Sequence, residues 1–160
     1  MATQELSKTA GAITAMLTTG LLVGVLDGIA AETLYFTSGG KDPLIVFQYI
    51  ASGVFGRASF SGGMVLAACG LIFHLVIAFS WTSLFFLAYP RFPFLAKKRI
   101  LAGVSYGLVI WLAMNLVVLP LSKVRRGSFD YLRALTGIVV LIVAVGVPVS
   151  HSAHKYYSKE

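Results

Sequence analysis

The chain alternates between long apolar stretches and short polar ones. Four apolar stretches cover residues 12–36, 64–89, 100–119 and 132–149. Each has about 18–26 residues, enough for an α-helix to cross the roughly 30 Å hydrocarbon layer of a bilayer. The pattern predicts four transmembrane helices, packed as an antiparallel bundle in a single membrane domain that comprises residues 1–160.

A shorter apolar stretch, about residues 43–56, lies between the first and second long ones. Asp42 followed by Pro43 favours a helix start at this point. Only about 14 residues precede Arg57, too few to span a bilayer. We expect an interfacial or re-entrant helix that does not cross the membrane. The predicted fold class is an all-α membrane protein with four transmembrane helices and this short additional helix.

The composition supports a membrane location. Hydrophobic residues make up 58% of the 160 residues and charged residues 12%, and the mean hydropathy is +0.85. Soluble domains have about 45–50% apolar and about 25% charged residues. The first apolar stretch is longer than the core of a signal peptide, so we expect it to be retained as a membrane helix. The lone Cys69 cannot form an intramolecular disulfide.

The charge pattern indicates lipid as a partner and not nucleic acid. The net charge is +7, and most basic residues stand at the ends of the apolar stretches, where they contact anionic headgroups. Because four helices would cross the membrane, both termini should lie on the same side of it. That side carries seven basic residues, and the opposite side carries six. The Lys97-Lys98-Arg99 cluster favours cytoplasmic termini. The opposite side carries Lys41, Arg57, Lys123, Arg125, Arg126 and Arg133.

Four polar side chains stand within or near the ends of the apolar stretches: Asp27, Glu32, His74 and Asn115. A carboxylate that faces lipid costs several kcal/mol, so these groups should point into the bundle. Counted from the helix ends at 1.5 Å per residue, all four lie in the half of the bilayer next to residues 43–56. The pattern predicts a polar pocket lined by these four groups.

The residues of the short helix are placed to cover such a pocket, with Gln48 and Tyr49 as the expected lid. The pocket would hold or pass a proton or a small solute through Asp27 and His74. The alternative is that the polar groups only hold helices together, with His74 bonded to a backbone carbonyl. That alternative is favoured for Glu32 and Asn115.

Small residues recur at helical spacing in three of the long helices. They form faces along which another helix can approach closely. The glycines expected to serve helix packing are Gly20, Gly24, Gly28, Gly63, Gly70, Gly103 and Gly107.

The sequence lacks the residues that several kinds of functional site require. A bis-histidine haem needs two facing histidines within the membrane, and only His74 stands there. No serine has an evident base partner, and no strand precedes a phosphate-binding loop. His151 and His154 follow the fourth apolar stretch and are expected to be a solvated tail. We therefore expect no catalytic residues, no metal site and no cofactor.

Four segments carry a family resemblance: VGVLDGIAAE at 23–32, IASGVFGRASFSGG at 50–63, GLIFHLVIAFSW at 70–81 and YGLVIWLAMNLVVLPLS at 106–122. They resemble a family of small, uncharacterised four-helix proteins of the bacterial inner membrane. The family has no established activity, although some members are linked to acid or envelope stress. The resemblance implies a multi-pass protein of that membrane.

The sequence supports two hypotheses for the function. The first is a small membrane protein whose polar pocket handles protons or a small solute, as a single chain or a homo-oligomer. The second is a structural or accessory protein that packs against a larger membrane protein partner through its glycine faces.

Overall fold

The computed structural model describes residues 2–124 and 130–158, with side chains from residue 9 onward. The described residues are almost entirely helical and contain no strand. Arg125, Arg126 and Lys159, which entered the charge balance, lie outside the described residues.

Four helices are long and apolar enough to cross a membrane, as predicted. The first is α1 (Ala2–Thr37) and the second is α3 (Gly63–Ala88). The third is built from α5 (Arg99–Ala113), η3 (Met114–Val118) and α6 (Leu119–Leu121). The fourth is built from α7 (Tyr131–Val140), η4 (Leu141–Gly146) and α8 (Val147–Tyr157).

Shorter helices connect the long ones. The α2 helix (Leu44–Phe55) and the 3₁₀ helix η1 (Gly56–Ser61) lie between α1 and α3. The 3₁₀ turn η2 (Tyr89–Arg91) and α4 (Pro93–Lys97) lie between α3 and α5. Asp42 starts α2 as the sequence suggested, because its Oδ1 accepts a hydrogen bond from the Leu44 N–H at 2.9 Å.

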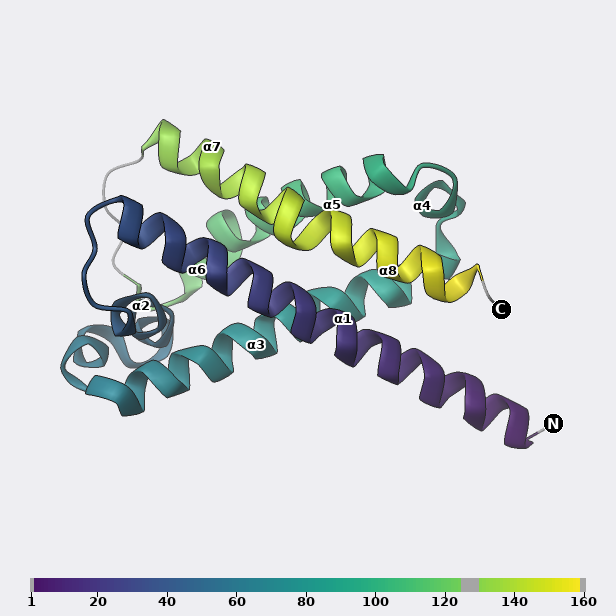
Figure 1. The fold of residues 1–160 in the computed structure, drawn as a ribbon, viewed down its shortest axis with the longest axis horizontal. Helices are drawn as coiled ribbons and strands as arrows, with labels where there is room; N and C mark the ends of the chain where they lie inside the picture. The colour runs from purple at the N-terminus through teal and green to yellow at the C-terminus, as the bar shows by residue number, and fades with distance from the viewer. Residues whose placement is uncertain (1, 125–129, 159–160) are drawn as a thin grey trace.

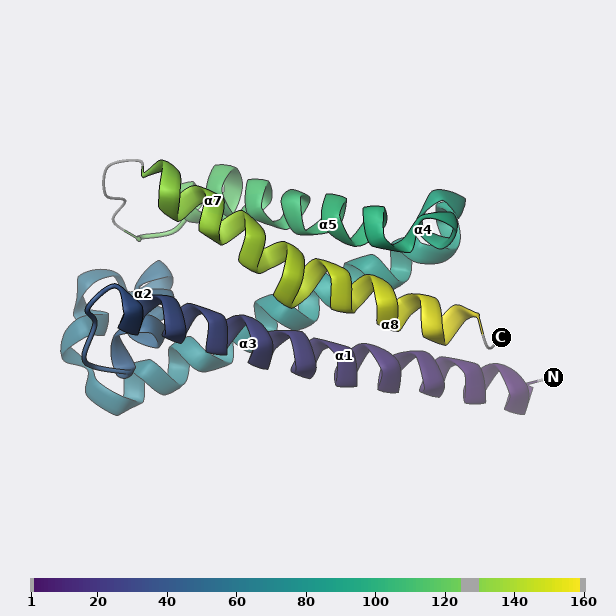
Figure 2. The same cartoon turned by 45° about the horizontal axis from the view of Figure 1, so that its top comes forward.

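The long helices converge at one end of the molecule and separate at the other. α1 contacts α3, η4 and α8, and α5 contacts η4 and α8. Figures 1 and 2 show α8 beside α1 near the chain termini, whereas α7 stands away from α1 at the opposite end, where α2 lies. The buried core is at the converging end and includes Phe85, Phe86 and Val149. The separated end leaves room between the helices.

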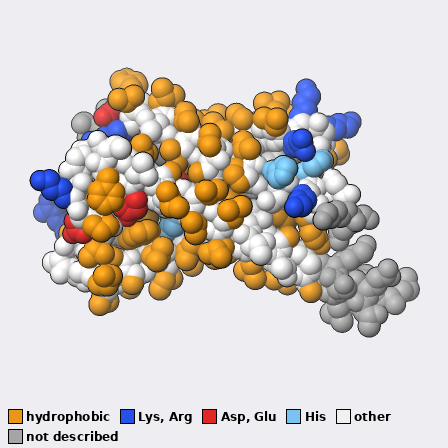
Figure 3. Space-filling view, viewed as in Figure 1, with side chains coloured by type: hydrophobic (Ala, Val, Ile, Leu, Met, Phe, Trp, Pro, Cys, Tyr) orange, Lys and Arg blue, Asp and Glu red, His pale blue; other side chains and the backbone are white. Residues whose placement is uncertain are grey.

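The outer surface is apolar around the middle of the molecule. Figure 3 shows hydrophobic side chains over the centre and basic side chains gathered towards the two ends. Val65 is 72% exposed and Leu116 is 68% exposed. Large apolar side chains that face outwards on every long helix are what a bilayer environment requires.

The α2 helix is held tightly on the first half of α3. A Cβ atom on Gly70 would lie 1.8 Å from the backbone oxygen of Phe47, so the two helices touch backbone to backbone. Gln48 Nε2 donates a hydrogen bond to the Gly63 carbonyl at 3.0 Å, and Gln48 is 3% exposed. Gln48 therefore fixes α2 in place.

Two π-helical segments interrupt the third and fourth helices, each two residues before a proline. η3 ends at Val118 ahead of Pro120, and η4 ends at Gly146 ahead of Pro148. A proline inside a helix lacks the N–H for the i→i−4 hydrogen bond, and its ring crowds the carbonyl of residue i−4. Widening the preceding turn relieves this crowding.

The fourth helix continues beyond the predicted end at 149 to Tyr157. The expected solvated tail is therefore wrong for His154, which is half-buried with its Nδ1 atom 2.8 Å from the Tyr89 hydroxyl. Tyr89 also stacks on Tyr157, with ring centroids 5.1 Å apart. These contacts tie the end of α8 to the η2 turn that follows α3. His151, one turn earlier, is exposed.

Candidate functional site

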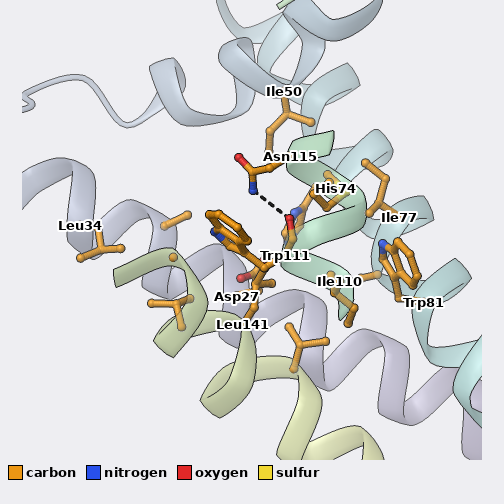
Figure 4. Close-up of a pocket in the computed structure, with 16 residues that line it drawn as sticks. Asp27, Leu34, Ile50, His74, Ile77, Trp81, Ile110, Trp111, Asn115 and Leu141 are labelled. Carbon is orange, nitrogen blue, oxygen red and sulfur yellow. Dashed lines mark hydrogen bonds between the residues drawn. The ribbon is translucent and has the colours of Figure 1, made fainter. Parts of the chain in front are cut away.

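A cavity of about 360 Å³ lies between the long helices at their separated end. Every long helix contributes to its wall, and both π-helical segments border it. Figure 4 shows Asp27, His74, Trp111 and Asn115 around it, with Trp81 farther along. Most other lining side chains are apolar; they include Ala31, Ile50, Ile77, Ile110, Met114, Leu141 and Val145.

Asp27 presents its carboxylate to the cavity from the middle of α1. It is half-buried, and among the described residues no hydrogen bond to its oxygens is found. Gly24 stands about one turn before it and Gly28 directly follows it, and both glycines let α3 approach closely. Asp27 therefore borders the small-residue face on which α3 docks.

His74 lines the cavity from α3 and is 8% exposed. Its Nε2 atom lies 2.8 Å from the Gly24 carbonyl oxygen. A carbonyl only accepts hydrogen bonds, so Nε2 carries a proton and donates it. This hydrogen bond was expected under the alternative in which the polar groups only hold the helices together. It also fixes the orientation of the ring.

Asn115 stands at the start of η3 and also lines the cavity. Its Nδ2 atom donates to the Trp111 carbonyl at 2.9 Å, one turn earlier (Figure 4). The structure thus brings three of the four predicted polar residues, Asp27, His74 and Asn115, to one cavity.

Glu32 is the exception. It does not line the cavity, although it lies between Asp27 and the end of α1. Both of its carboxylate oxygens are buried, and among the described residues neither has a hydrogen-bond partner. At 100° per residue, five residues turn the side chain about 140° away from Asp27 on the helix.

The expected lid residues do not line the cavity either. Gln48 faces α3, and Tyr49 is 44% exposed and borders a neighbouring groove. The α2 residue at the cavity wall is Ile50. The short helix therefore covers the cavity with an apolar side chain.

Both tryptophans of the chain, Trp81 and Trp111, line the cavity. The Trp111 indole lies against Gly137, where an added Cβ would be 3.2 Å from Nε1. The Trp81 carbonyl accepts a hydrogen bond from the Tyr106 hydroxyl. Sequence reasoning overlooked the two indoles as cavity residues, although Trp81 shares the small-residue face of His74.

Six of the seven predicted packing glycines lie against a neighbouring helix within the chain. An added Cβ would meet Phe79 at Gly20, Leu75 at Gly24, His74 at Gly28, the Phe47 backbone at Gly70, the Gly146 and Val147 backbone at Gly103, and Ile142 at Gly107. Gly63 is different, because its φ is +55° and nothing lies within 4 Å of an added Cβ. Gly63 serves the turn into α3 through its backbone conformation.

Two further hollows adjoin the cavity at the same end. One has about 490 Å³, lies between α2, α3 and the end of the third helix, and shares Ile50, Ile77 and Met114 with the cavity. Its lining is mainly apolar. The other, also about 490 Å³, lies between the end of α1 and α7 and includes Asp130 and Arg133. The cavity thus adjoins one apolar and one more polar surface.

No cluster of three or more metal-binding side chains occurs in the described part of the chain. Among the residues that the structure describes, the cavity wall contains no lysine or arginine, and its ionisable side chains are Asp27 and His74. The chain matches no protein-family model, and no curated protein or solved structure is similar to it.

Proposed function

We propose that the protein is a multi-pass protein of a bacterial inner membrane that takes up a small solute in the cavity between its long helices. In this proposal the long helices form an antiparallel bundle with cytoplasmic termini, and α2 lies in the membrane without crossing it. Asp27 and His74 are the polar contacts for the solute. The Lys97-Lys98-Arg99 cluster on the side of the termini supports the orientation.

One observation carries the proposal: the Asp27 carboxylate opens into a cavity and, among the described residues, has no hydrogen-bond partner. A carboxylate serving only to hold helices together would be bonded to a neighbouring helix, because an unpaired polar group in the membrane costs several kcal/mol. Water or a solute in the cavity supplies the missing partner. His74, held by the Gly24 carbonyl, is the second polar group within the same wall.

The alternative, a structural protein that binds a larger partner through glycine faces, has less support. The glycine faces of α1, α3 and α5 are already occupied by helices of the same chain. A partner would have to bind the outer apolar surface instead. Homo-oligomer formation through that surface is compatible with either function.

The proposal is tested by measuring whether water reaches the cavity. In a Cys69→Ala background, Ala31→Cys places a thiol on the cavity wall and keeps Asp27 intact. A charged, water-soluble methanethiosulfonate reagent should modify this thiol in membrane vesicles. Ile29→Cys, on a residue 60% exposed on the outer surface, and Val23→Cys, on a fully buried residue, are the matched controls on the same helix and should not react.

The side of reaction tests the orientation. If the termini are cytoplasmic, a reagent that cannot cross the membrane should modify Ala31→Cys from the outer face only. If Ala31→Cys reacts no faster than Val23→Cys, the cavity is closed and dry, and the proposed function is wrong.

A further inference from the structure

We infer that the solute bound in the cavity is an organic monocation with an apolar body, such as a benzyl- or alkylammonium ion. This inference rests on the proposed function and names its ligand class. It depends on the charge, the aromatic groups and the apolar surface of the cavity.

The charge of the cavity favours a cation. In the part of the chain that the structure describes, Asp27 is the only carboxylate in the wall, and the wall contains no lysine or arginine. His74 directs its Nε2 proton to the Gly24 carbonyl and not to Asp27. A half-buried carboxylate with no lysine or arginine beside it attracts a cation, because the surroundings screen the interaction less than bulk water does.

The two indoles favour an organic cation. Trp81 and Trp111 line the cavity from different helices (Figure 4). Tryptophan is the aromatic side chain that attracts cations most strongly, and the attraction increases when the site is shielded from water. A metal cation instead needs about six or more oxygen ligands for Ca²⁺ or Mg²⁺. Over residues 2–124 and 130–158, Asp27 and Asn115 are the only wall residues whose side chains contain oxygen, too few for such a metal site.

The shape and polarity of the cavity favour an amphipathic molecule. Its volume of about 360 Å³ is near the lower end of ligand pockets, which span roughly 300–1,000 Å³. The apolar hollow that shares Ile50, Ile77 and Met114 with it lies between α2 and α3. A molecule dissolved at the membrane interface can approach the cavity through this apolar surface.

Intrinsic fluorescence provides the assay, since both tryptophans of the chain line the cavity. The full chain in phosphatidylcholine nanodiscs would be titrated with benzyltrimethylammonium. The matched probes are neopentylbenzene, which has the same shape without the charge, and benzylsulfonate, which carries the opposite charge. We expect a saturable change in emission with the cation only.

Substitutions of Asp27 test whether its carboxylate contacts the cation. Asp27→Asn should weaken binding of the cation at least about tenfold, because it removes a charge-assisted contact. Asp27→Glu, which keeps the charge, should restore binding to within a few-fold. Asp130→Asn changes a carboxylate outside the cavity and should leave binding unchanged.

Equal affinity of the wild type and Asp27→Asn would overturn the inference, as would equal binding of neopentylbenzene or preferential binding of benzylsulfonate. The reaction of Ala31→Cys distinguishes a failure of the ligand class from a failure of the proposed function. If Ala31→Cys reacts but the cation does not bind, the ligand class is wrong and the proposed function stands. If Ala31→Cys does not react, the proposed function itself is wrong.

Discussion

Replacing Gly70 by alanine tests whether the short helix is held on α3 as closely as the structure has it. An added Cβ would lie 1.8 Å from the Phe47 oxygen and 2.6 Å from its carbonyl carbon, both backbone atoms. Real contacts of this kind stay above 3.0 Å, so α2 must move away by more than 1 Å. That movement strains the Gln48–Gly63 hydrogen bond and the position of Ile50 at the cavity.

The expected cost follows from two opposing effects. Overpacking costs about 1–3 kcal/mol, and rigid backbone neighbours place Gly70→Ala at the upper end. Exchanging glycine for alanine within a helix returns about 1 kcal/mol. We therefore expect a net loss of about 2 kcal/mol in the free energy of unfolding, measured by titration with sodium dodecyl sulfate and followed by circular dichroism.

Gly53→Ala is the matched control for this prediction. Its Cβ would lie 3.6 Å from the Ser122 Cβ, an ordinary contact, so the stability should be unchanged or slightly higher. If Gly70→Ala is as stable as Gly53→Ala, the close approach of α2 to α3 is wrong, and so is the position of Ile50 over the cavity.

Two further substitutions test the elements around the cavity. Asp130→Ala removes the N-cap of α7, where Oδ1 accepts from the backbone N–H groups of Leu132 and Arg133. It should cost about 1 kcal/mol of stability, whereas Asp130→Asn should preserve it; equal stability of the two variants would contradict the cap. Tyr106→Phe removes the hydrogen bond to the Trp81 carbonyl, so it should cost about 1 kcal/mol and alter tryptophan emission. Tyr49→Phe, on an exposed residue, should change neither quantity, and equal behaviour of both variants would refute the role of Tyr106.

The four long helices and the polar cavity residues on α1 and α3 were predictable from the sequence. Length and apolar composition identify the helices, and small residues around Asp27 and His74 indicate faces that pack inwards. Counting residues from the helix ends placed the two groups at similar depth, and the structure has both in one cavity wall. The depth of a residue in the membrane follows from the rise per residue of its helix, so it can be estimated without knowing the tertiary fold.

Other features depend on contacts that periodicity does not specify. The rotation of α1 about its own axis decides that Asp27, and not Glu32, faces the cavity. The π-helical turns near Trp111 and Leu141 arise from Pro120 and Pro148, but the same apolar residues fit an ordinary helix equally well. The length of the fourth helix was underestimated because its last turns are polar and are held by contacts of His154 and Tyr157 with α3 and the adjoining η2 turn.

The central claim is that Asp27 borders a cavity that water reaches from the end of the molecule where α2 lies. The rate at which a water-soluble thiol reagent modifies Ala31→Cys in a Cys69→Ala background tests it most directly. The account predicts modification from one face of the membrane, much faster than that of Val23→Cys or Ile29→Cys. An Ala31→Cys rate equal to that of Val23→Cys would contradict it.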